Sequence, residues 1–460
     1  MSTSASSSSS RPQSPGSDTG TSGGSGIPGP TVADRPRVVV VGAGFGGMNV
    51  VKGLEGVDCD IILVDRRNHH LFQPLLYQVA TAALSPADIA QPIRTIFRRQ
   101  KNVQVVLGEA TEVNLEKRTV RVDDDVIAYD WLILAAGATH SYFGNDHWAE
   151  RAPGLKTVED ALDIRRRILS AFEAAEMEDD PESREAKLTF VVVGGGPTGV
   201  ELAGALREIA AETIPEDFRR VDTSTARIIL MEGLDRLLPA MSAAASARAL
   251  KDLDAMGVEV RLNTMVTDLD DDAVWVDDER FPAANVFWAA GVKGESIAET
   301  LGVELDKRGR IPVEPDCSVP GHPRTFVIGD LAAQVDGQTG EPVPGVAQGA
   351  IQMGAFVARV IADSIIQGEP LPARRPFHYR DKGDLASIGR ARAVADLRDH
   401  TYTGFFAWVL WSVVHVGFLI GFRNKVLVMI NWAWQWLQQG RGARLITGTR
   451  SIRPKKQVDL

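Results

Sequence analysis

The chain has 460 residues, 44% of them hydrophobic and 24% charged, which is a globular composition long enough for two or three domains. The formal charge of −10 is unevenly divided, because fifteen Lys and Arg against five Asp and Glu give the part from residue 371 onward +10 and leave −20 for the rest. An acidic body excludes nucleic acid as the expected partner, since phosphates attract a basic surface.

Residues 1–35 are rich in Ser, Gly, Pro and Thr and lack the apolar run of a secretory signal, so we expect a disordered leader and a cytoplasmic body.

Cys59 and Cys317 are too few and too far apart for a disulfide framework, an all-cysteine zinc site or a C-x-x-C pair. Neither has a neighbour that would lower its pKa, so thiol chemistry is not expected. His69 and His70 have no further ligand at metal spacing, and no metal is predicted.

Continuous β-branched and apolar runs predict strands that are covered on both faces, as in parallel sheets. A helical pattern over 158–176 lies between two of them. Strands that alternate with helices predict an α/β, doubly wound fold. The runs lie within 37–47, 59–65, 131–137, 188–196, 226–232, 285–291 and 325–330.

One motif pattern occurs twice in the chain. A strand with a glycine-rich turn, an acid-ended strand and an AAG strand lie at 38–47, 65 and 135–137, and again at 189–199, 232 and 289–291. This repeat predicts two Rossmann-like dinucleotide-binding domains, the second inserted into the first because the 325–330 strand returns to the first. The predicted boundaries are 36–155 with 285–370, 156–284, and a C-terminal region 371–460.

The first turn, GAGFGG at 42–47, has the spacing of a phosphate-binding loop. Gly42 would allow the tight turn, Gly44 the close approach of a pyrophosphate and Gly47 the packing of helix on strand. The helix that follows would supply amides and a positive dipole end to the phosphates. Asp65, 18 residues beyond Gly47, is near the spacing at which a carboxylate meets ribose hydroxyls. The alternative is a purely structural turn.

The second turn, GGGPTG at 194–199, repeats the arrangement with Gly194, Gly196 and Gly199. Its acid, Glu232, comes 33 residues after Gly199, and an extended helix and loop over 207–225 would account for the extra length. A carboxylate at this position accepts ribose hydroxyls and repels a 2′-phosphate, which favours NAD(H) over NADP(H), although Arg236 lies four residues on.

Two such units together with TFVIGD at 325–330 resemble the two-dinucleotide-binding flavoproteins, in which an Asp of the last motif holds the ribityl chain of FAD. The resemblance implies that the first unit and Asp330 bind FAD and that the second unit binds NADH; a simple turn acid is the alternative for Asp330. It also implies further contacts with FAD and NADH, which are Gly46, Arg66, Gln73, Ala110, Gly137 and Ala347 for FAD, and Pro197, Thr198 and Gly291 for NADH.

Four segments resemble type II NADH dehydrogenases, the single-chain NADH:quinone oxidoreductases that do not pump protons. They are NHHLFQPLLYQVATAALSP (68–86), AQGAIQMG (347–354), YRDKGDLASIGRARAVADL (379–397) and WLQQGRGARLITG (436–448). The resemblance covers the chain from about residue 36 onward. It implies hydride transfer from NADH to FAD and transfer of two electrons from reduced FAD to a membrane quinone.

The same resemblance assigns residues to the quinone side. Its AQ-x-A-x-Q stretch lines the quinone tunnel and corresponds to Ala347, Gln348 and Gln352, which by spacing alone would begin an ordinary helix. Lys382 corresponds to a lysine near the quinone, or is a solvated charge in a polar loop. Glu201 follows the second turn and either assists nicotinamide binding or proton movement, or complements the macrodipole of its helix.

Two apolar stretches end the chain, FFAWVLWSVVHVGFLIGF (405–422) and VLVMINWAWQW (426–436), and five of the nine tryptophans lie between 408 and 436. Tryptophan prefers the membrane interface, and the basic tail suits an anionic leaflet. We predict a peripheral anchor of amphipathic helices on the cytoplasmic face of the membrane, with a protein interface or a transmembrane span as alternatives. The resemblance implies a homodimer.

Three other functions compete with this one. A flavin reductase for a soluble electron carrier would need no Trp-rich apolar tail. An NADH-sensing flavoprotein resembling apoptosis-inducing factor would turn over slowly. A sulfide:quinone oxidoreductase shares the fold and the membrane habit, but it carries cysteines that flank the flavin, and this chain lacks such a pair.

Overall fold

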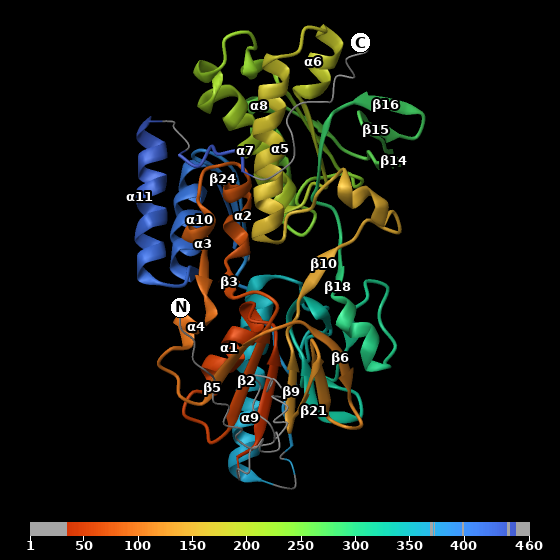
Figure 1. Cartoon of the computed structure of the whole chain (residues 1–460), viewed down its shortest axis with the longest axis vertical. Helices are drawn as coiled ribbons and strands as arrows, with labels where there is room; N and C mark the ends of the chain where they lie inside the picture. Colours follow the sequence, from red (N-terminus) through yellow and green to blue (C-terminus); the bar gives the residue numbers. More distant parts are fainter. Residues whose placement is uncertain (1–34, 369–370, 372, 398–399, 439–441, 448–460) are drawn as a thin grey trace, which may run out of the picture. The chain divides into compact units, whose positions relative to one another are not determined.

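Two sheets dominated by parallel strands carry the two glycine-rich turns (Figure 1). The computed structural model describes residues 35–368, 371, 373–397, 400–438 and 442–447, so the predicted leader lies almost wholly outside the described residues. The first sheet has the order β20-β21-β9-β1-β2-β5, and the second has the order β13-β12-β11-β17. Their bounds are β1 Arg37–Val41, β2 Asp60–Asp65, β5 Val103–Leu107, β9 Trp131–Leu134, β20 Ser318–Val319 and β21 His322–Val327, and β11 Thr189–Val193, β12 Arg227–Met231, β13 Val258–Arg261 and β17 Asn285–Trp288.

The predicted α/β fold is confirmed strand by strand. Each of the seven apolar runs contains a strand, and β21 pairs in parallel with β9, so the 325–330 segment does return to the first sheet. The side chains of β9 and β11 are buried along their whole length, as expected for strands covered on both faces. The domain boundaries drawn from the sequence stay a prediction.

Helices join and cover these strands. In the first half, α1 (Phe45–Gly53) packs on α9 (Ala347–Gln367), and a Cβ at Gly354 would lie only 2.4 Å from the carbonyl oxygen of Gly46. The second half contains α5 (Val158–Glu176), α6 (Pro181–Lys187), α7 (Pro197–Glu208) and α8 (Ala243–Met256). The bounds of α5 coincide with the predicted helix, because Thr157 and Asp160 form a capping box at its start.

Two short antiparallel strands connect the two halves, β10 (Ala138–His140) and β18 (Val292–Gly294). Smaller elements surround the sheets. They are β3 His69–Leu71, β4 Ala90–Pro92, β6 Ala110–Asn114, β7 Thr119–Val122, β8 Asp125–Ala128, β14 Asp268–Leu269, β15 Ala273–Val276, β16 Glu279–Pro282, β19 Ile311–Pro312 and β22 Ala332–Ala333, with the helices α2 Leu76–Ala80, α3 Pro86–Ile89 and α4 Ile93–Phe97.

The C-terminal region begins with a sheet, which was not predicted from the sequence. Strands β23 (Asp384–Gly389), β24 (Arg392–Leu397) and β25 (His400–Thr403) are antiparallel and precede α10 (Gly404–Phe418) and α11 (Phe422–Gln438). A tight turn joins β23 to β24, and Ala391 adopts φ +59° there. The sheet packs on α7, where a Cβ at Gly204 would lie 1.8 Å from the carbonyl oxygen of Ile388.

Most of the apolar run predicted over 405–422 forms α10, and the run ends at the first residue of α11. The two helices lie side by side (Figure 1). Helix α10 has 15 residues and is therefore about 22 Å long, less than the roughly 30 Å of a bilayer core. Among the described residues, one helix is long and apolar enough to cross a membrane, namely α9. Eight residues of α9 are buried, as in the core helix of a folded protein.

We expect Gly204→Ala to destabilise the protein by about 1–3 kcal/mol, since the added methyl group meets a backbone oxygen that cannot rotate away. Thermal or urea unfolding measures the loss. Gly417→Ala is the matched control, because nothing lies within 4 Å of its Cβ position in α10 and alanine favours a helix. Equal stability of the two variants would contradict the close packing of α7 on β23.

Candidate active site

The first glycine-rich turn is closed by a carboxylate from the neighbouring strand. Asp65 Oδ2 accepts a hydrogen bond from the Ala43 amide at 2.6 Å, and Oδ1 accepts one from the Arg67 amide at 2.7 Å. Gly42 has φ +99°, and a Cβ there would lie 2.3 Å from the Ala135 carbonyl oxygen. A Cβ at Gly47 would lie 1.9 Å from the Gly42 oxygen. The turn therefore tolerates glycine alone at these two positions.

The second turn has the same construction. Glu232 accepts from the amides of Gly195 and Leu234, the residues that correspond to Ala43 and Arg67 in the first turn. Gly194 has φ +108°, and its Cβ position is 2.8 Å from the Ala289 carbonyl carbon. A Cβ at Gly199 would lie 1.8 Å from the Gly194 oxygen. The repeat seen in the sequence is thus a repeat in three dimensions.

Both turns fit a dinucleotide phosphate. The middle glycines, Gly44 and Gly196, have no atom within 4 Å of their Cβ positions, so each turn has open space where a phosphate approaches the backbone. Each is the N-cap residue of its helix, α1 or α7, and neither helix receives a side-chain cap there. The first-turn amides are therefore available to an anion. Gly46 belongs to the start of α1, and Pro197 and Thr198 belong to the first turn of α7.

The remaining residues assigned to FAD lie around the carboxyl ends of the first sheet. Gly137 follows β9 with φ +80°, and Ala110 begins β6. Asp330 follows β21, and one of its carboxylate oxygens is 3.5 Å from the Cβ position of Gly345, just before Ala347 begins α9. In the second half, Gly291 follows β17 with φ +72°. Carboxyl ends of neighbouring parallel strands form the crevice in which such folds bind ligands.

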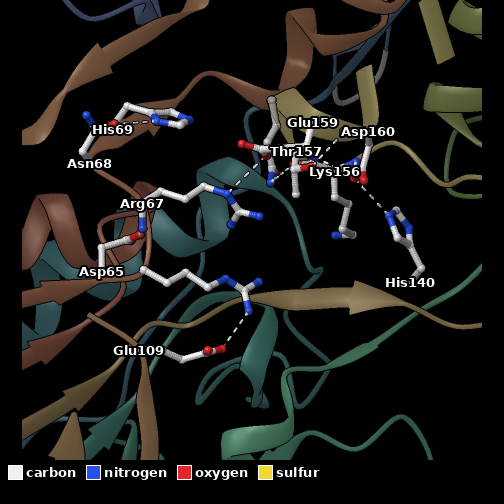
Figure 2. Close-up of polar contacts among 12 residues, drawn as sticks. Asp65, Arg67, Asn68, His69, Glu109, His140, Lys156, Thr157, Glu159 and Asp160 are labelled. Carbon is white, nitrogen blue, oxygen red and sulfur yellow. Dashed lines mark hydrogen bonds and ion pairs between the residues drawn. The ribbon is translucent and has the colours of Figure 1, made fainter. Parts of the chain in front are cut away.

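Charged side chains join the two halves beside the first turn (Figure 2). Arg67 lies 3.5 Å from Glu159 at the start of α5, and the Gln73 side chain donates to the Lys156 carbonyl oxygen at 3.2 Å. Arg66 pairs with Glu295 at 2.7 Å and with Glu109 at 3.6 Å. The contacts of Arg67 and Gln73 link the region after β2, where the FAD ribose is expected, to the segment that leads into the second half, whereas Arg66 contacts the loops after β5 and β18.

The glutamines of the AQ-x-A-x-Q stretch hold a loop. Gln348 donates to the Gly383 carbonyl oxygen at 3.2 Å and accepts from the Lys382 amide at 3.2 Å. Gln352 donates to the Arg380 carbonyl oxygen at 3.0 Å and accepts from its amide at 2.9 Å. Both side chains therefore fasten the 380–383 loop to α9, and the side chain of Lys382 on this loop is exposed.

Glu201 is the most perturbed carboxyl group of the site. It is the fifth residue of α7 and only 8% exposed, so it is neither in the first helical turn nor solvated, and its interpretation as a macrodipole partner is wrong. Burial raises its pKa to about 8, against a weaker opposing effect of a 3.3 Å hydrogen bond from the Ser387 amide. At neutral pH this carboxyl group is mostly protonated and holds a transferable proton.

Glu201 lies at the inner end of a cavity between α7, α2, β23 and the C-terminal helices. The cavity has room of about 100 Å³ for water-sized molecules. Residues that the sequence did not assign line it, among them Tyr77, Gln78, Ser387, Trp411 and Trp432. Tyr77 and Gln78 belong to the 68–86 segment and the tryptophans to the Trp-rich tail, so the sequence had marked both segments as of interest. No pattern in the sequence indicates that the two segments meet at one cavity.

Both cysteines are free and buried. Burial raises the pKa of the Cys59 thiol to about 11 and that of Cys317 well above its usual value. Within the ranges that the structure describes, no group of three His, Cys, Asp or Glu side chains is arranged to hold a metal ion.

Family models and relatives match most of the chain. Residues 36–354 match the pyridine nucleotide-disulphide oxidoreductase family, and residues 382–441 match the NDH2 C-terminal domain. The type II NADH:quinone oxidoreductases Ndh and NdhA of Mycobacterium tuberculosis are each 47% identical to this chain over 431 residues. That alignment covers 91% of this chain and 92% of Ndh, and 90% of both chains for NdhA. The chain belongs to the type II NADH:quinone oxidoreductase family.

The fold agrees with this assignment. The structure of NDH2 from Plasmodium falciparum in complex with NADH superposes with a TM-score of 0.79 at 20% identity, over 90% of this chain and 100% of that one. The family predicted from four short segments and two glycine-rich turns is thereby confirmed.

We expect Glu232→Gln to narrow the preference for NADH over NADPH by about tenfold, because removal of one negative charge removes the repulsion of a 2′-phosphate. The ratio of kcat/KM for the two nucleotides measures this change. Glu259→Gln, at an exposed ion pair with Arg227 in the same sheet, is the control. An unchanged ratio in Glu232→Gln would contradict the role of this carboxylate in nucleotide selection.

Proposed function

We propose that this chain is an FAD-dependent NADH:quinone oxidoreductase that works at a membrane surface without pumping protons. Family membership carries the proposal, and the duplicated phosphate-binding turns support it, since the reaction needs two dinucleotides in one protein. When bound, FAD accepts a hydride from NADH and returns two electrons to a quinone.

The first turn, Asp65, Gly137 and Asp330 would hold FAD, and the second turn, Glu232 and Gly291 would hold NADH. The links between Arg67 and Glu159 and between Gln73 and Lys156 keep the two nucleotide sites in a fixed relation. Such alignment is the main contribution that a protein makes to hydride transfer, because the two rings react only at close contact. No covalent nucleophile is needed.

Reduction of the quinone to a quinol consumes two protons and two electrons, while NADH supplies two electrons and one proton. Each turnover therefore takes one further proton from water. Glu201 is suited to donate it, because its carboxyl group is buried and its pKa is raised to about 8. Gln348 and Gln352 position the Lys382 loop, which we propose borders the quinone.

The other functions lack support of this kind. A sulfide:quinone oxidoreductase would need reactive cysteines, and both thiols here are buried with raised pKa values. A soluble-carrier reductase or an NADH sensor leaves the apolar outer face of α10 and α11 without a purpose.

The decisive test follows the flavin absorbance of the purified protein without oxygen. We expect NADH to bleach it and a short-chain quinone to restore it. Lys382→Ala should slow the quinone step about tenfold and leave the NADH step unchanged, since the loop borders the quinone alone. Bleaching without recovery in the wild-type protein would refute the proposed acceptor, and an equal loss in both steps would refute the role of Lys382.

Quinone-dependent reoxidation should also depend on pH through Glu201. Its carboxyl group donates a proton only when protonated, so the rate falls as pH rises through about 8. Glu201→Gln should slow reoxidation by about a hundredfold and abolish this decline, while NADH still reduces the flavin. Stopped-flow absorbance across roughly pH 6 to 10 measures both effects. A decline that persists in Glu201→Gln would assign the titration to another group.

We further propose that α10 and α11 attach the protein to the membrane surface, as the apolar tail predicts. Their inner sides are joined to the body by polar contacts, such as the 2.7 Å hydrogen bond from Trp432 to Gln78 and the bond from Asn431 to Asp88. Their outer sides leave large apolar side chains exposed. These are Phe405, Phe406, Val409, Val413, Phe418, Met429, Ile430, Trp434 and Leu437.

Such a continuous apolar surface is typical of an interfacial anchor, and attachment there would bring a lipid-soluble quinone to the protein. The cytoplasmic face and the homodimer stay predictions from the charge distribution and the resemblance.

The anchor is tested by a triple variant, Phe406→Ser, Val413→Ser and Ile430→Ser. We expect its binding to anionic phospholipid vesicles to fall by at least about tenfold, because three exposed apolar groups no longer enter the lipid. Ile366→Ser is the control, since Ile366 is 77% exposed on α9, outside this surface. Undiminished flotation of the triple variant with vesicles would contradict the anchor.

A further inference from the structure

The cavity that ends at Glu201 extends along one side of α7 and of the short π-helix that continues it, Ile209–Thr213. Glu201, Ala205, Glu208, Glu212 and Thr213 all line it. Twelve residues of helix span about 18 Å, so the cavity connects a buried carboxyl group with a distant part of the surface.

Three carboxyl groups follow one another along this wall. Glu208 and Glu212 come seven and eleven residues after Glu201, which is about two and three helical turns. Their exposure increases in the same order, because Glu201 is buried, Glu208 is half-buried and Glu212 is exposed. A series of acids from solvent to a buried acid is an arrangement along which a proton can move through hydrogen-bonded water.

The opposite wall supplies further polar groups at the inner end. The Gln78 side chain donates to the Tyr77 hydroxyl at 3.1 Å, and the Trp432 indole donates to the Gln78 carbonyl oxygen at 2.7 Å. The indole nitrogen of Trp411 is buried, and no described group accepts a hydrogen bond from it in good geometry. It lies near the Glu201 carboxyl group and lowers the pKa of that group slightly, against the larger effect of burial. Water in the cavity would satisfy this donor.

The size of the cavity decides what it can hold. Its 100 Å³ admit several water molecules, since a water needs about 10–15 Å³ of such space. Pockets for organic ligands begin at roughly 300 Å³, so a quinone ring and its tail do not fit.

The outer end is bordered by Arg390 and Trp436. The Arg390 amide donates to a Glu208 carboxylate oxygen, its guanidinium donates to the Trp436 carbonyl oxygen, and the same guanidinium lies 5.3 Å from the centre of the Trp436 ring. These contacts fasten α11 to the turn between β23 and β24 and leave Glu212 at the opening. The C-terminal helix thereby forms part of the channel wall.

We propose that this cavity is a water-filled channel that conducts protons from solvent, by way of Glu212 and Glu208, to Glu201. The proposal rests on the proposed quinone reductase function. In each turnover the Glu201 carboxyl group gives one proton to the reduced quinone and becomes a carboxylate, and one proton from water restores it through the channel. The titratable groups that line the cavity with Glu201 are Tyr77 on α2, Glu208 and Glu212 on the same wall, and Arg390 at the outer side. Of the elements packed against Glu201, α10 also carries His415 and β23 carries Asp384, both outside the lining.

The test compares a double variant, Glu208→Gln with Glu212→Gln, with the control Glu216→Gln, an exposed acid just beyond the cavity. Glutamine keeps the acceptor for the Arg390 amide, so the fold is preserved. At saturating short-chain quinone we expect kcat to fall by about tenfold, the solvent deuterium isotope effect to rise, and formate or azide to restore the rate by carrying protons. The KM for quinone and the bleaching by NADH should not change.

The possible results separate the two proposals. A raised KM for quinone without rescue would show that the cavity admits the quinone, and a double variant equal to wild type would show that protons take another path; either overturns the channel. Glu212→Gln alone, at an exposed position without risk to folding, should give a smaller loss with the same rescue. A wild-type protein that bleaches with NADH and never recovers with quinone would instead overturn the proposed function.

Discussion

The site depends on the hydrogen bonds that the glycine-rich turn after one strand donates to an acid at the end of the neighbouring strand. Asp65 and Glu232 each accept from two backbone amides, one in the turn and one two residues beyond the acid itself. Each turn is thereby fixed with its middle glycine open to solvent and the amides of the following helix unoccupied by side chains. A cavity for phosphate results without any cationic side chain, because the backbone itself provides the donors. The same geometry occurs twice, which allows two dinucleotides to be held by one chain.

The C-terminal sheet gives the second Rossmann-like unit a buried acid that the first unit lacks. In the corresponding position of the first unit, two residues beyond the last glycine, Asn49 bonds to its own helix, whereas the second unit has Glu201. Strand β23 approaches α7 so closely that only glycine fits at position 204, and it covers Glu201 in the process. Burial then raises the pKa of this carboxyl group, and a cavity that Glu208 and Glu212 also line extends from it. A residue that would be an ordinary helix acid in an isolated Rossmann unit becomes a buried acid with a raised pKa because another part of the chain lies over it.

The helices that present an apolar surface also complete the wall of this cavity. Trp432 and Gln435 of α11 face the body and bond to Gln78 and to the Ala83 carbonyl oxygen, while Trp434 and Leu437 face outward. This helix thus has two sides, one that lines the cavity and one that leaves large apolar side chains exposed. Attachment to a membrane and supply of protons would then involve the same element, on opposite faces.

The sequence by itself determined the two Rossmann-like units, the strands, the helix at 158–176, both acid partners and the family, because glycine spacing and continuous apolar runs are local signals. It also singled out Glu201, Gln348, Gln352 and Lys382. Only the tertiary structure decided what surrounds them. The Ser387 amide, 186 residues away in the sequence, donates to Glu201, and the Lys382 amide, 34 residues away in the sequence, donates to Gln348. The sheet over 384–403 escaped prediction because its short strands alternate weakly and lie next to a strongly apolar tail. Contacts between segments distant in the chain leave no periodic pattern, so burial, a raised pKa and a cavity wall made from several elements become visible only when the chain is folded.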